Sequence, residues 1–169
     1  MYDRKDKSYD KDETRTPPEL FKKLDDRFHF CCDVAATWRN ALCLHLFSKD
    51  QSNALDRDWY SPNTTDYWNN TFYCNPPYSN PEPFIKKSYE ESLKGCTVVI
   101  LLNADTSTIA FHKYCMKASE IIFLYPRVKH LKPDGTIIPS SSPFGSMVVV
   151  FKQEEFDGSP VISSMRWKD

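Results

Sequence analysis

The residue types best suited to chemistry occur together in the tetrapeptide Asn75-Pro76-Pro77-Tyr78. Its two prolines remove two backbone N–H donors and fix φ, so the turn presents carbonyl oxygens in a rigid arrangement. The side-chain oxygen of Asn75 and the Pro76 carbonyl can together accept both protons of an exocyclic NH2 group. Tyr78 supplies a face on which a planar ring can stack. The tetrapeptide therefore predicts a site that positions a planar amine.

The placement of the tetrapeptide favours this hypothesis over a plain proline turn with a buried tyrosine, which the same residues also fit. The tetrapeptide directly follows an apolar run at 71–74 that is typical of a strand, and open α/β sheets bind ligands at the carboxyl ends of their strands. Upstream, a run over 28–34 contains Asp33, and a helix start lies at Thr16-Pro17-Pro18. These positions are where a cofactor at the same sheet edge would need contacts.

The elements that must position this edge alternate along the chain. We expect a helix from Thr16 to near Asp26, further helices over 35–47, 81–94 and 108–117, and strands over 28–34, 71–74, 97–102, 121–125 and 146–152. In the helix over 35–47, Trp38 is expected to face inward. This pattern predicts one α/β domain over 16–169, with a mixed, mostly parallel sheet and helices on both faces. Residues 1–15 are mostly charged and are expected to be a disordered tail.

Composition excludes several classes of protein. Four glycines among 169 residues cannot supply a GxGxxG turn or a Walker loop. The six cysteines have no zinc-site spacing, so no metal is expected, and reduced thiols predict a cytoplasmic protein. No apolar run approaches the ~20 residues of a membrane span, and a signal peptide is not expected. The net charge of −1 means that any nucleic acid must be bound by local basic patches.

An ordered set of motifs adds a family resemblance. It comprises Thr16-Pro17-Pro18-Glu19-Leu20-Phe21, Phe28 to Phe30, Asp33-Val34-Ala35-Ala36, Asn40, Leu55 with Trp59, Asn75-Pro76-Pro77-Tyr78-Ser79, Leu101-Leu102, Ala104-Asp105-Thr106-Ser107-Thr108, Arg127 and Ser142-Pro143-Phe144-Gly145-Ser146. In this order the motifs resemble the phage-type DNA N6-adenine methyltransferases, often grouped with Dam enzymes, which use S-adenosylmethionine. The Asn-Pro-Pro-Tyr motif alone also occurs in cytosine N4 and glutamine N5 methyltransferases.

The resemblance implies a Rossmann-like class I methyltransferase fold and a role for each motif. The segment Thr16-Pro17-Pro18 corresponds to a contact near the methionine end of the cofactor. The motif Asp33-Val34-Ala35-Ala36 follows the first strand, with alanines in place of a glycine-rich turn. Asn53 stands where the family commonly has an aspartate for the cofactor's adenine amino group. The catalytic residues implied are Asn75, Pro76, Pro77 and Tyr78, acting on an adenine flipped out of the DNA stack.

The partners implied are double-stranded DNA and no membrane, for a monomer or weak homodimer in the cytoplasm, or in the host's cytoplasm if a phage encodes the chain. Contacts with the DNA are expected from Arg127, Lys129 and Lys132, which could equally form a solvated loop, and from Trp59, whose loop at 48–70 could instead pack on the core. The alternatives in function are methylation of another planar NH2 group, namely cytosine N4, RNA adenine or a glutamine amide, and a non-catalytic nucleic-acid-binding protein.

Overall fold

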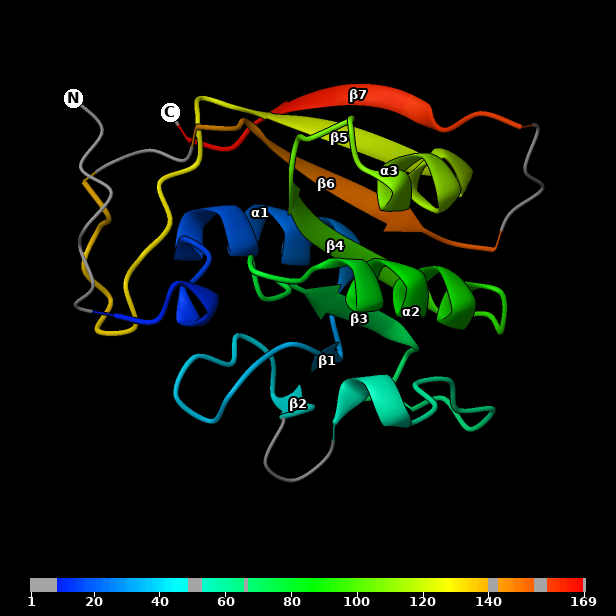
Figure 1. Cartoon of the computed structure of the whole chain (residues 1–169). Helices are drawn as coiled ribbons and strands as arrows, with labels where there is room; N and C mark the ends of the chain where they lie inside the picture. The colour runs from blue at the N-terminus through cyan, green and yellow to red at the C-terminus, as the bar shows by residue number, and fades with distance from the viewer. Residues whose placement is uncertain (1–8, 49–52, 66, 140–142, 154–157, 169) are drawn as a thin grey trace.

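Figure 1 shows a computed structural model, which describes residues 9–48, 53–65, 67–139, 143–153 and 158–168. The helices are α1 (Pro18–Phe28), α2 (Glu82–Ser92) and α3 (Ile109–Lys113), with 3-10 turns η1 (Lys11–Glu13), η2 (Ala54–Asp56) and η3 (Cys115–Lys117). The strands are β1 (Cys32–Asp33), β2 (His45–Leu46), β3 (Thr71–Cys74), β4 (Thr97–Asn103), β5 (Glu120–Tyr125), β6 (Ser146–Phe151) and β7 (Val161–Arg166).

The strands form one sheet in the order β2-β1-β3-β4-β6-β5-β7. Strand β6 runs antiparallel to both of its neighbours, and every other pairing is parallel. The predicted mixed, mostly parallel sheet is therefore confirmed. The carboxyl ends of β1, β3 and β4 lie at the same edge of the sheet, on its left-hand side in Figure 1.

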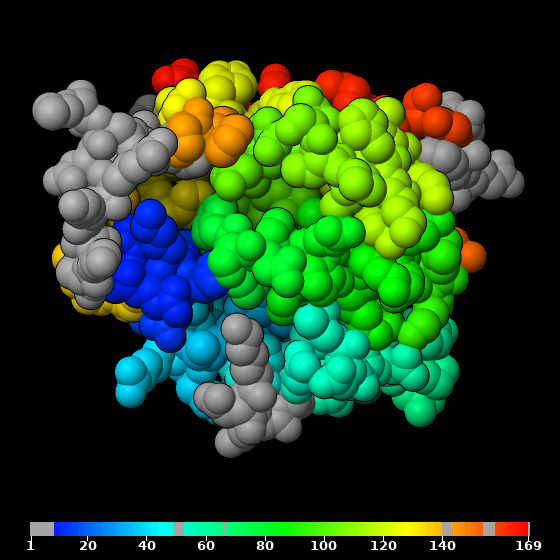
Figure 2. Space-filling view, in the orientation of Figure 1, coloured from blue at the N-terminus to red at the C-terminus, as the bar shows by residue number. Residues whose placement is uncertain are grey.

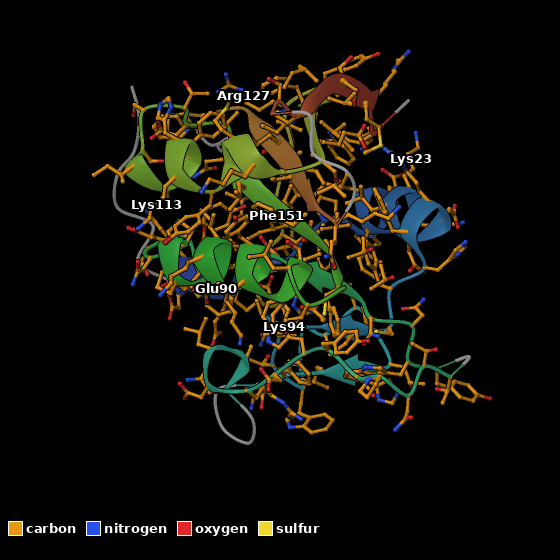
Figure 3. All side chains as sticks on the ribbon, turned by 90° about the vertical axis from the view of Figure 1, so that its right-hand side faces the viewer. Lys23, Glu90, Lys94, Lys113, Arg127 and Phe151 are labelled. Carbon is orange, nitrogen blue, oxygen red and sulfur yellow. The ribbon has the colours of Figure 1, made fainter. Side chains whose placement is uncertain are left out.

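Each face of the sheet buries its own apolar core. Along β4, the side chains of Val98, Ile100 and Leu102 belong to one cluster, whereas Val99 and Leu101 belong to the other. Residues of α2 and α3 cover the first cluster, and residues of α1 cover the second, as the period of two along a strand requires. Figure 3 shows Phe151, at the end of β6, between α2 and α3. The predicted helices on both faces are confirmed.

The loop after β1 does not form the helix predicted over 35–47. The Asp33 carboxylate accepts hydrogen bonds from the backbone N–H groups of Ala35 and Leu42, both at 3.3 Å. The Asn40 side chain accepts from the backbone and the hydroxyl of Thr37. These side-chain bonds compete with helical ones and fix an irregular loop that ends in strand β2. Trp38, which was predicted to face inward, is 68% exposed.

Further differences lie at element boundaries. Helix α1 continues to Phe28 and ends at His29, which adopts the left-handed conformation (φ 56°), so the first strand is confined to Cys32–Asp33. Strand β7 was not predicted. Residues 1–8 of the expected tail lie outside the described residues. Residues 10–15, however, form η1 and pair with the loop at Leu131, so the described fold begins earlier than Thr16.

Candidate active site

The side chain of Asn75 is oriented by a neighbouring backbone carbonyl. It follows β3 directly, and its Nδ2 donates a hydrogen bond to the Thr14 carbonyl at 3.3 Å. The amide oxygen Oδ1 is buried and has no hydrogen-bond partner among the described residues. A buried polar atom without a partner is costly, and native proteins rarely leave one. The site thus presents a free acceptor at the atom that the sequence predicted to hold an amine.

Tyr78 is held by a residue that we did not predict as part of the site. The Tyr78 hydroxyl lies 2.7 Å from Nε2 of His130, and the two rings meet edge to face with centroids 5.3 Å apart. Burial raises the pKa of the Tyr78 phenol above its ordinary value. Burial also lowers the pKa of His130 to about 4, although a hydrogen bond with the Arg15 backbone acts in the opposite direction. Both rings are therefore uncharged at neutral pH.

A cavity of about 310 Å³ opens on one side of the turn. Pro76 and Tyr78 form one wall, residues of α2, β4 and α3 form the others, and Phe144 reaches its rim. Figure 2 shows a hollow between the green surfaces of α2 and of the segment leading into α3. Most of the lining is apolar, with Asn103, Asp105 and Thr108 as polar groups. The cavity can accept a planar ring against Tyr78.

A second, tighter pocket lies on the Asn75 side. It brings together four of the predicted cofactor residues, Thr16, Asp33, Ala35 and Ala36, with Asn75. Asp12, Thr14 and Arg15 also line it, and its volume is about 20 Å³. Pro17, the N-cap of α1, and Pro18, its first residue, place Thr16 at this wall but do not line the pocket themselves.

Asp33 is the buried carboxylate of this pocket. Burial raises its pKa to about 7, and the two backbone N–H groups that it accepts from, at Ala35 and Leu42, act in the opposite direction. Nearby, the Thr16 hydroxyl lies 2.6 Å from the Tyr73 hydroxyl. The pocket therefore has a polar floor set on β1 and β3.

Residues 12–15, which we call the strap, form hydrogen bonds with the turn that follows Asn75 and with the loop that contains Leu131. The Asp12 carboxylate accepts from the Ser79 backbone N–H at 2.8 Å and from the Ser79 hydroxyl. Arg15 and Leu131 exchange two backbone hydrogen bonds, at 2.8 and 2.9 Å. Within the described chain, Thr14 Oγ1 and Arg15 Nε are buried without a partner, and both residues line the same pocket as Asn75 Oδ1. Three unsatisfied polar atoms at one pocket fit a polar ligand there.

Two predicted site residues lie elsewhere. Asn53 is exposed and caps η2, where its side chain accepts from the Leu55 backbone and donates to Asp56, so it does not line the pocket. Trp59 is 1% exposed, and its indole donates to the Ala54 carbonyl at 2.8 Å. Trp59 is thus part of the core, and we withdraw it as a DNA contact.

The predicted basic residues lie along one loop at the same sheet edge. Arg127 is exposed and donates to the Pro143 carbonyl at 3.2 Å, and Lys129 is exposed. Lys132 lies with its ammonium 5.2 Å from the centre of the Tyr9 ring. Lys132 begins a hairpin whose turn contains Gly135 at φ 87°, a conformation that favours glycine. The structure therefore brings the three cations to the edge that carries both pockets.

The described part of the chain holds no group of three or more residues that could bind a metal ion. None of its helices combines the length and apolar character that crossing a bilayer requires.

Comparison with known proteins decides the family. Residues 4–167 match the sequence model of the family described as DNA N-6-adenine-methyltransferase (Dam). The chain belongs to the Dam family. The resemblance drawn from the motifs is thereby confirmed, and the seven-stranded mixed sheet agrees with the methyltransferase fold that it implied. A methyltransferase needs a bound methyl donor, and the small polar pocket at Asn75 is the candidate place for it.

Two phage proteins illustrate the relationship. A DNA N-6-adenine-methyltransferase of Escherichia phage T1 is 34% identical over 110 residues, which are 64% of this chain and 43% of that protein. A DNA N-6-adenine-methyltransferase of Haemophilus phage HP1 (strain HP1c1) is 35% identical over 123 residues, which are 70% of this chain and 65% of that protein. The Dam-family chain therefore matches less than two thirds of the length of either relative.

Proposed function

We propose that this Dam-family chain transfers a methyl group from S-adenosylmethionine to the N6 amine of an adenine flipped out of double-stranded DNA. The observation that carries the proposal is the free, buried Oδ1 of Asn75. It stands on a rigid turn between a small polar pocket and a larger, mostly apolar cavity. That arrangement suits two ligands that must meet at one nitrogen atom.

The turn orients the target amine. The Thr14 carbonyl holds Nδ2 of Asn75, which leaves Oδ1 to accept one N6 proton, and the Pro76 carbonyl accepts the other. These acceptors aim the nitrogen lone pair at the pocket lined by Thr16 and Asp33. The base itself occupies the larger cavity and stacks on Tyr78.

The chain's own residues also hold the methyl donor. Thr16, Asp33, Ala35 and Ala36 would form its cradle, with Arg15 and Thr14 covering it. When bound, S-adenosylmethionine supplies a methyl group on a sulfonium leaving group. The N6 proton becomes acidic only as the new C–N bond forms, so the site needs no strongly basic side chain. The rate therefore depends on positioning and local electrostatics.

A loop that contains three basic residues supports DNA as the substrate. Arg127, Lys129 and Lys132 lie at the same edge as the cavity, where they can neutralise phosphates on either side of the flipped base.

We propose that the protein acts as a monomer or weak homodimer.

The test is product analysis with a methyl-labelled donor. The protein is incubated with labelled S-adenosylmethionine and, in parallel, with duplex DNA, RNA and a glutamine-containing peptide, and the products are analysed by mass spectrometry. We expect label in N6-methyladenine from DNA. Label in N4-methylcytosine, in RNA or in the peptide would support one of the alternative acceptors. Calorimetric binding of the donor without any labelled product would instead favour a non-catalytic protein.

A further inference from the structure

Among the described residues, His130 is the one whose side chain forms a hydrogen bond with the Tyr78 hydroxyl. The hydroxyl lies 2.7 Å from Nε2 and 3.3 Å from Nδ1, so it lies against the imidazole with Nε2 as the nearer nitrogen. The two rings lie edge to face with an interplanar angle of 77°, and both imidazole nitrogens lie near the hydroxyl end of the Tyr78 ring. Tyr78 also lines the 310 Å³ cavity. One aromatic ring is thus held at its edge by the imidazole and borders the space for a base.

The backbone around His130 is fixed from several sides. The His130 carbonyl accepts from the Ile138 N–H at 3.1 Å, and the next residue, Leu131, exchanges two hydrogen bonds with Arg15 in the strap. Leu131 also bridges to Ile137 across the hairpin. Only 8% of His130 is exposed. The imidazole therefore has a defined position relative to the turn that carries Asn75 and Tyr78.

The imidazole is uncharged under the conditions in which a methyltransferase works. Its pKa of about 4 follows from burial, and a neutral ring has one nitrogen that can accept the proton of the phenol. A charged imidazolium would have no acceptor nitrogen. The hydroxyl contact is therefore a fixed feature of the site across the neutral range.

We propose that His130 is a positioning residue for DNA methylation, which orients the ring of Tyr78 for stacking on the flipped adenine by accepting its hydroxyl proton. The proposal rests on the proposed function. His130 touches neither the base nor the donor and acts through Tyr78. Because Asn75 aligns the amine only if the base lies in the right plane, loss of this orientation slows the chemical step. It leaves the binding of duplex DNA nearly unchanged, since phosphate contacts dominate that affinity.

The test compares kcat, the KM for DNA and the dissociation constant of S-adenosylmethionine across four variants. His130→Leu and Tyr78→Phe each remove one partner of the hydrogen bond, H130Q keeps an acceptor, and the double variant removes both partners. We expect each single loss to lower kcat by about tenfold, with KM for DNA and donor affinity within about twofold. H130Q should recover part of the loss. His45→Leu, an exposed histidine on β2, is the matched control.

Coupling is the decisive outcome. Once Tyr78→Phe has removed the hydroxyl, adding His130→Leu should lower kcat by no more than about twofold further. Losses that multiply in the double variant, or an unchanged kcat in both His130→Leu and H130Q, would overturn the proposal. If His130→Leu fails to fold, the comparison of H130Q with Tyr78→Phe decides it. An inactive wild type would overturn the proposed function, and this inference with it, whereas an active wild type with indifferent variants overturns this inference alone.

Discussion

At the scale of single residues, the site combines a free acceptor with a buried acid. Asn75 Oδ1 has no partner among the described residues, and Asp33 lies on the floor of the same pocket, accepting from two backbone N–H groups. Among the described residues, the hydrogen-bond partners of both side chains are backbone groups and not cations. Asn75 Oδ1 is therefore free to accept from a ligand, whereas the hydrogen bonds of Asp33 also fix the loop after β1.

Asp33 makes stability depend on pH in an unusual direction. Its folded pKa of about 7 lies above the ordinary value of 3.8, so between about pH 4 and pH 7 the unfolded chain loses a proton that the folded chain keeps. The unfolded state then binds fewer protons, and this group's contribution to stability falls as pH rises through that window.

The Asp33→Asn variant removes this titration. We expect the difference in Tm between variant and wild type to shift in favour of the variant as pH rises from 4 to 7. Thermal unfolding of both proteins, followed by circular dichroism at several pH values, measures it. A difference in Tm that stays constant across the window would mean that Asp33 ionises in the folded protein as it does in the unfolded chain.

At the scale of elements, we propose that the strap moves when the methyl donor enters the pocket beside Asn75. The pocket that it covers has a volume of about 20 Å³, whereas sites for small molecules of this size measure roughly 300–1,000 Å³. Hydrogen bonds between Asp12 and Ser79 hold the strap to the turn that follows Asn75. The backbone hydrogen bonds between Arg15 and Leu131 hold it to the loop that contains Leu131.

Weakening the strap should therefore speed exchange of the donor. For Asp12→Asn and for Ser79→Ala, we expect S-adenosylmethionine to associate and dissociate about two- to tenfold faster, because a charge-assisted hydrogen bond at a partly exposed site is lost. Stopped-flow binding measures both rates. Asp26→Asn, which removes an exposed acid paired with Lys22 on α1, is the control. Rates equal to wild type in both strap variants would show that the cofactor enters without opening the strap.

The elements that the sequence predicts well are those set by local pattern. The unbroken apolar run of β4 and the proline-started helix α2 were predicted within a few residues, as was the turn at Asn75. The loop after β1 has apolar spacing that suits a helix, but the Asp33 carboxylate reaches the N–H of Leu42, nine residues away, and fixes another conformation. The edge strand β7 is mostly exposed and carries a weak pattern.

The site residues divide in the same way. Asn75 and Tyr78 could be proposed from the sequence because their chemistry and their place after a strand lie within one short stretch. His130 contacts Tyr78, 52 residues away in the chain, so no local signal marks it, beyond its place in a basic segment. Trp59 looked available for stacking, but Glu91, 32 residues later in the chain, accepts from its backbone N–H and fixes it in the core.

At the scale of the whole molecule, the net charge of −1 means that the proposed binding of DNA must depend on local basic residues. The loop with Lys129 lies beside the strap and the catalytic turn, whereas Lys117 precedes the amino end of β5 at the opposite edge of the sheet. Binding should therefore depend on the place of a cation and not on the total charge.

Salt dependence of DNA binding separates these positions. For Lys129→Ala, we expect the slope of log K against log salt concentration to fall in magnitude by about 0.9, the value for one phosphate contact on duplex DNA. The slope for Lys117→Ala should equal that of wild type. Fluorescence anisotropy with labelled duplex DNA measures both. Equal slopes for the two variants would place the DNA on another surface.

The central claim is that the Asn75 amide oxygen holds the amine that is methylated. Its most direct test measures N6-methyladenine in DNA by nucleoside mass spectrometry for wild type and Asn75→Ala, with donor affinity measured by calorimetry on the same preparations. We predict that wild type forms N6-methyladenine and that Asn75→Ala forms none above background, while it binds S-adenosylmethionine within a few-fold of wild type. Undiminished formation of N6-methyladenine by folded Asn75→Ala would contradict the account.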